Sequence, residues 1–78
     1  MGKVHQIGNV IIRIWGGDHL PPHFHIIAPD FEAAVEIDTM TVIVGILPKA
    51  GRPALEWARQ NKVAIIAEWN RTNPRFPL

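Results

Sequence analysis

Apolar and polar residues alternate along several short stretches of the N-terminal part of the chain. The clearest is FEAAVEID at 31–38, where every odd-numbered residue is apolar; this two-residue period is typical of a half-buried antiparallel strand. The β-branched runs at 10–15 and 41–47 and the segment HFHIIA at 23–28 also predict strands. Turn-forming glycine, proline and aspartate separate these stretches, so the pattern predicts four strands in succession.

A helical period follows the last of these stretches. Gly51 and Pro53 suit a helix start, because a proline at the first helical position gives up a donor that would be unpaired there anyway. From there to about Asn70, one stripe at 3.6 residues per turn holds Ala54, Leu55, Ala58, Ile65 and Trp69. We expect a kink or a break into two short helices at Asn61, since Trp57, Val63 and Ala64 lie off this stripe.

These elements together predict an α+β fold. We expect a four-stranded, mostly antiparallel β-meander with one or two C-terminal helices packed on one face. The chain of 78 residues predicts a single domain, 1–78, with a core at about 8–70 and an irregular tail at 71–78.

Composition narrows the setting in which such a small domain works. The chain contains no cysteine, which excludes a disulfide framework and thiolate chemistry and favours a reducing compartment. No apolar run is long enough for a membrane span, and the N-terminus has no signal-peptide pattern. We therefore expect a cytoplasmic protein with no membrane partner, stabilised by packing or self-association.

Charge is distributed unevenly along the chain. Residues 1–38 carry two basic and five acidic residues, a net charge of −3, and residues 39–78 carry six basic and two acidic residues, a net charge of +4. A basic C-terminal half can contact nucleic acid or an acidic partner. The candidate contact residues are Lys49, Arg52 and Arg59, near the predicted helix start and along it.

The candidate chemistry is concentrated in DHLPPHFHII at 18–27, which holds three of the four histidines. If Pro29-Asp30 is the tip of a hairpin, His23 and His25 share the outer face with the acidic residues of 31–38, and His23 lies opposite Glu36. The site candidates are therefore Asp18, His19, His23, His25 and Glu36.

Three interpretations of this cluster remain open. The histidines can hold the turn or contact a partner, which is the leading interpretation. They can also bind a divalent metal (zinc, manganese or iron), with His23 and His25 as ligands and Asp18, His19 or Glu36 completing the shell. Without metal, an imidazole beside a carboxylate can act in acid–base catalysis. No other catalytic motif supports an enzyme.

The predicted sheet has more apolar surface than one helix can cover. Either face of the strand at 10–15 carries large side chains, and Ile27 and Ile43 add to the outer face. Such surface in a small domain usually marks an interface, so we expect a homo-oligomer or a dedicated partner. The alternative is that the tail, with Phe76 and Leu78, folds over this surface.

Several short motifs resemble a known family. The segments PPHFH, FEAAVEID, LPK and LEWA occur in the order of a family of small bacterial proteins described as domain of unknown function 4160, over roughly 8–69. The resemblance points to an acidic or polar residue around Asp18 and to a further set of matching positions: His23, His25, Glu32, Glu36, Asp38, Lys49, Glu56 and Trp57. The chain departs from the family pattern at AGRP (50–53) and in the apolar TMTVIVGILP (39–48).

The resemblance also implies a functional setting. Members of this family are often encoded beside another small protein, in an arrangement similar to toxin–antitoxin pairs. The leading expectation is therefore a small interaction module, one member of a toxin–antitoxin-like or regulatory two-gene pair, whose partner is a small protein. The alternative is a metal-dependent hydrolase or nuclease that uses His23 and His25.

Overall fold

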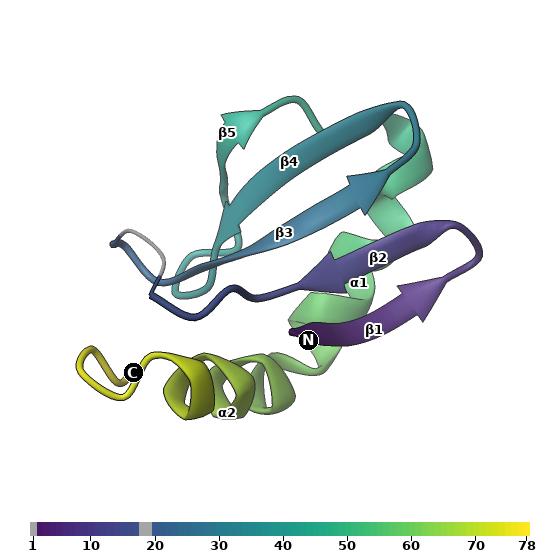
Figure 1. Cartoon of the computed structure of the whole chain (residues 1–78). Helices are drawn as coiled ribbons and strands as arrows, with labels where there is room; N and C mark the ends of the chain where they lie inside the picture. Colours follow the sequence, from purple (N-terminus) through teal and green to yellow (C-terminus); the bar gives the residue numbers. More distant parts are fainter. Residues whose placement is uncertain (1, 18–19) are drawn as a thin grey trace.

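A computed structural model describes residues 2–17 and 20–78 of the chain. It shows an α+β fold in which a five-stranded antiparallel sheet, in the order β1-β2-β3-β4-β5, packs against C-terminal helices (Figure 1). The strands are β1 (Lys3–Ile7), β2 (Val10–Arg13), β3 (His23–Ala28), β4 (Phe31–Glu36) and β5 (Val42–Gly45). A short 3₁₀ helix η1 (Lys49–Gly51) leads into α1 (Arg52–Gln60) and α2 (Lys62–Thr72).

The predicted meander is confirmed, but the sheet has one more strand than expected. β1 pairs with β2, with Ile7 opposite Val10 and His5 opposite Ile12. The apolar residues of β1, Val4 and Ile7, are three positions apart. This spacing does not fit the two-residue period of a strand, and the segment is too short to show a helical period, so the sequence did not predict this strand. Tertiary contact stabilises this strand instead: the His5 ring stacks on the Trp57 ring of α1, with centroids 4.0 Å apart.

The β3–β4 hairpin positions the candidate site, and its register matches the sequence prediction. Pro29 and Asp30 form a two-residue loop, and the pairs run from Ala28 opposite Phe31 to His23 opposite Glu36. Alternation along these strands directs one set of side chains toward the helices. That set includes Phe24, Ile26 and Val35, which are fully buried.

The core lies between this face of the sheet and the helices. Four of the five residues in the predicted helical stripe are buried, with Ala58, Ile65 and Trp69 fully inaccessible, and Leu55 is partly buried. The expected interruption also occurs: α1 ends at Gln60, and Asn61 leaves helical geometry at φ −125° while its Nδ2 donates to the Trp57 carbonyl. No helix among the described residues is long and apolar enough to cross a bilayer.

The C-terminal tail turns back onto α2. Trp69 Nε1 donates to the Phe76 carbonyl at 2.8 Å, and the Leu78 amide donates to Asn70 Oδ1 at 2.7 Å. Phe76 and Leu78 remain about half exposed beside the helix. The tail therefore does not cover the other face of the sheet, which was the alternative considered from the sequence.

Candidate functional site

In the part of the chain that the structure describes, helices cover one face of the sheet and not the other. The helices contact β1 and β2 on the core side, and in Figure 1 they lie behind and below the sheet. The opposite face, which carries His25, Glu32, Ala34 and Val44, is called the open face below. It bears a hollow of about 690 Å³ whose lining includes these four residues together with Leu20 and His23.

His23 lies at the buried end of this hollow. Its exposed fraction is only 7%, and its ring centroid lies 6.1 Å from that of Trp69 in the core. His23 Nδ1 is 2.8 Å from the Pro21 carbonyl oxygen, and since a carbonyl can only accept, the ring nitrogen donates. A second hydrogen bond holds this proline turn, because the Ile37 amide donates to the Pro22 carbonyl. His23 therefore has an orientation set by the backbone on which it lies.

His25 is the histidine that meets a carboxylate. Its Nδ1 lies 3.4 Å from Glu32 Oε2, and its ring is 5.0 Å from that of His23, centroid to centroid. The expected convergence of two imidazoles and an acid on one face is thus present. The contacting acid is Glu32, the diagonal neighbour across the ladder, which belongs to the predicted outer face although Glu36 was the acid named as a site candidate.

Glu36 occupies its predicted register position opposite His23, but its carboxylate is engaged elsewhere. Thr39 Oγ1 donates to Glu36 Oε1 at 3.2 Å, within the turn that follows β4. The Met40 amide also donates to the Glu36 carbonyl. Hydrogen bonds within this turn thus hold Glu36. The alternation of residues along the strand does not predict them.

The metal-site prediction is only partly addressed by this geometry. Asp18 and His19, two of its candidate ligands, lie outside the described residues. Among residues 2–17 and 20–78, no three His, Asp or Glu side chains are grouped so as to hold a metal ion. The described part of the cluster therefore supplies two adjacent imidazoles and one nearby carboxylate.

An aromatic and cationic rim adjoins the histidines. The Trp15 ring lies 6.2 Å from that of His25, and the Arg13 guanidinium carbon is 5.6 Å from the Trp15 centroid. Trp15 is largely exposed, so this rim extends the open face beyond β3. Tryptophan and arginine are the residue types most often found at the energetic centres of protein interfaces.

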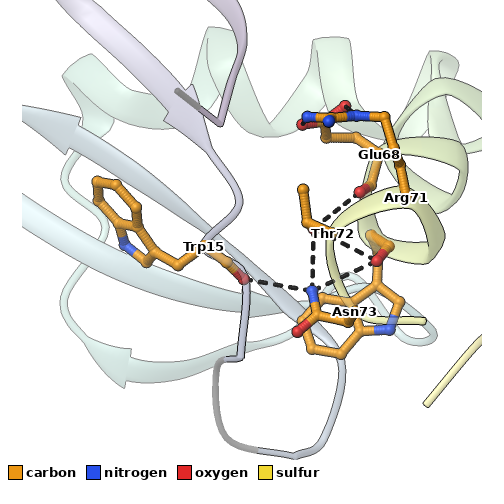
Figure 2. Close-up of polar contacts among 6 residues, drawn as sticks. Trp15, Glu68, Arg71, Thr72 and Asn73 are labelled. Atoms are coloured by element: carbon orange, nitrogen blue, oxygen red, sulfur yellow. Dashed lines mark hydrogen bonds and ion pairs between the residues drawn. The ribbon is translucent and has the colours of Figure 1, made fainter. Parts of the chain in front are cut away.

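Asn73 anchors the segment that follows β2, and the sequence analysis missed it. Its Oδ1 accepts from the Gly17 amide at 2.9 Å, and its Nδ2 is 3.2 Å from the Trp15 carbonyl oxygen. Figure 2 shows this amide between the Trp15 backbone and the end of α2, where the Thr72 hydroxyl and the Trp69 carbonyl also contact it. The Asn-Pro pair at 73–74 was the available signal, since it marks a helix end.

The basic candidates lie in the helical layer. Lys49 begins η1, and Arg52 and Arg59 lie at the two ends of α1, all of them exposed. None of these three lines the hollow. The structure therefore separates the basic residues from the histidine cluster.

Comparison with known proteins gives one match. A family model described as Domain of unknown function (DUF4160) matches residues 9–70. No curated protein and no solved structure matches the chain.

Proposed function

The chain belongs to the DUF4160 family, and we propose that it is a small cytoplasmic interaction module, one member of a toxin–antitoxin-like or regulatory protein pair. Its docking surface is the open face, and its partner is a small protein. The observation that carries this proposal is the hollow on a sheet face that neither the helices nor the tail covers.

The rim of the hollow is apolar at Leu20, Ile43 and Val44. Val44 is 65% exposed and Leu20 is 53% exposed, and Ile43 lies beside them. A contiguous apolar patch around a concavity is more typical of a protein interface than of a solvated surface. An apolar side chain of the partner is the group that such a hollow fits.

Charge narrows the chemistry of the partner. Glu32 is exposed at the hollow and Glu36 follows it on the same face of β4, within an N-terminal half of net charge −3. Opposite charges across an interface steer association and set register. Arg13 adds a positive charge beside His25 on the same face, so we expect a lysine or arginine next to the partner's apolar anchor only where the partner meets Glu32 and Glu36.

The resemblance supplies the identity of the first partner to test, because family members are often encoded beside another small protein. We expect the purified chain to bind the purified product of its neighbouring gene, measured by isothermal titration calorimetry. Leu20→Glu places a charge on the rim and Glu32→Lys reverses the charge complementarity. Each should weaken binding by about tenfold or more, the effect of losing one central interface contact.

Matched variants on the helical layer control for nonspecific effects. Val63→Glu introduces the same charge at an exposed apolar residue of α2, and Glu56→Lys reverses an exposed charge on α1. Both should bind as the unmodified chain does. Equal affinity for all four variants, or equal loss in all four, would contradict the open face as the docking surface.

A second candidate function, a metal-dependent hydrolase or nuclease, is supported by the orientation of the two histidines. His23 Nδ1 donates to a backbone carbonyl, and His25 Nδ1 faces the Glu32 carboxylate. Histidines that bind metals usually have one ring nitrogen oriented by such an oxygen. A bound zinc, manganese or iron(II) ion would supply an activated water for hydrolysis.

Metal titration distinguishes the two functions. A metal that binds only the folded state raises the melting temperature as its concentration increases. Under the hydrolase alternative, zinc or manganese should stabilise the unmodified chain, and His25→Ala should abolish that shift. Under the interaction proposal, metal leaves the melting temperatures of the unmodified chain and of His25→Ala unchanged. A metal-induced shift that is lost in His25→Ala would favour the hydrolase alternative.

A further inference from the structure

The two edges of the sheet are protected unequally. β1 and β5 are the end strands, and each pairs with one neighbour only, so each directs backbone N–H and C=O groups outward. On β1 the charged Lys3 is exposed, and its Nζ donates to Gln6 Oε1. A lysine on an edge strand is a common device against unwanted pairing, and β5 has none.

The β5 edge is apolar, exposed and free of charge. Val44 is 65% exposed, and Ile46, directly after the strand, is 82% exposed. No charged residue occurs between Asp38 and Lys49. Figure 1 places β5 at the edge of the sheet opposite β1, away from α2. An exposed apolar edge can act as a template for strand pairing, here over a short segment, because β5 has four residues and an irregularity in its register.

From these observations we propose that β5 pairs with β5 of a second copy of this chain. The pairing is antiparallel about a twofold axis and joins two five-stranded sheets into one continuous sheet. A twofold interface must be self-complementary, because the same patch lies on both sides. An uncharged strand satisfies this condition, since like charges directly opposite each other destabilise a strand pair. The chain as a whole carries a formal net charge of only +1.

The local geometry of β5 limits the backbone pairing to a short segment. Gly45 has φ +77°, and a Cβ there would lie 2.5 Å from the Glu32 carbonyl oxygen, so the strand ends where β4 approaches it closely. The register shift beside Ala34 leaves Ile43 as an extra residue on β5. The side chains of Val44 and Ile46, buried against their copies, therefore supply most of the association.

Val44 also lines the hollow proposed for the partner, but the dimer is tested separately because it is measured with the purified chain alone. Sedimentation equilibrium should show a monomer–dimer equilibrium. Val44→Lys/Ile46→Lys should raise the dissociation constant by about tenfold or more, because like charges then face each other. Val63→Lys is the matched control: Val63 is also 82% exposed but lies on α2, and this variant should dimerise normally.

A charge-swap experiment identifies the second copy as the occupant. Val44→Lys/Ile46→Lys and Val44→Glu/Ile46→Glu should each be monomeric alone and should form a heterodimer when mixed, because the opposed charges then attract. Circular dichroism confirms that each variant is folded.

An unmodified chain that stays monomeric at every concentration overturns the proposal. So does a Val63→Lys control that raises the dissociation constant as much as the β5 variant does. Loss of partner binding by the β5 variants in a chain that is monomeric would assign the edge to the partner instead.

Discussion

At the scale of single residues, the two histidines of the hollow differ in environment although they are two positions apart on one strand. His23 is buried and donates to a backbone carbonyl. His25 is more accessible and faces Glu32. His23 is therefore held by the backbone beside the hollow, and His25 is the more accessible imidazole of the two, so we propose His25 as the one that meets a ligand or partner.

The buried amide of Asn73 is the residue on which the loop after β2 depends. Asn73→Ala removes the acceptor of the Gly17 amide and the donor to the Trp15 carbonyl. We expect a loss of about 1–2 kcal/mol in the free energy of unfolding, the net value of one or two hydrogen bonds, because Gly17 and Trp15 are exposed and water can replace the lost partner. Urea unfolding at neutral pH measures it.

Asn70→Ala is the matched control for that substitution. Asn70 also bonds through its side-chain amide, but its partner is the exposed backbone of Leu78 at the chain end. We expect a much smaller change. If the two alanine variants are equally stable, Asn73 does not anchor the loop.

At the scale of elements, the helical region shows how local and tertiary signals combine. Pro53 near the start of α1 and Asn61 between the helices set the boundaries. Asn61 donates to Trp57, and its own carbonyl accepts from the Ile65 amide. The interruption lets both helices direct their small or apolar residues to the same core.

The last turns of α2 carry an ion pair that makes its stability depend on pH. Arg71 Nε donates to Glu68 Oε1 at 3.0 Å. This hydrogen bond, helped by the positive charge and opposed by desolvation, lowers the pKa of Glu68 below its ordinary value of 4.5. Because the folded pKa is the lower one, the pair stabilises the fold above the unfolded value and ceases to do so as the pH falls through the folded pKa.

Glu68→Gln tests this linkage. At neutral pH the variant should melt a few degrees or less below the unmodified chain, since exposed pairs contribute little. The difference should disappear as the pH is lowered through and below the ordinary glutamate range. Thermal melts followed by circular dichroism across that range measure it, with Glu56→Gln on α1 as the control for removing an exposed helical carboxylate. A difference that is constant with pH would contradict the role of the ion pair.

At the scale of the whole molecule, the two faces of the sheet have different tasks. One face packs against the helices and forms the core, and the other presents the hollow. A single layer of helices can cover only one face of a sheet. We therefore propose the open face and the β5 edge as the surfaces for assembly, and the two surfaces meet at Val44, which lies on β5 and also lines the hollow.

The amino-acid pattern predicted the elements whose signal is local. Alternation at 31–38 predicted β4, the Pro-Asp turn predicted the hairpin register that places His23 opposite Glu36, and the 3.6-residue stripe predicted the buried helical residues. It missed β1, because that strand is held by pairing with β2 and by stacking on Trp57, contacts between residues distant in the sequence.

What the amino-acid pattern by itself determined is which side chains share a face, because side-chain parity along a strand and helical period depend only on the local backbone. The tertiary structure alone decided which acid His25 meets, that His23 is buried, that Asn73 holds the loop, and that the tail lies on α2. These outcomes depend on turn geometry and on contacts across the fold. Such contacts form only once packing of the core has brought the segments together.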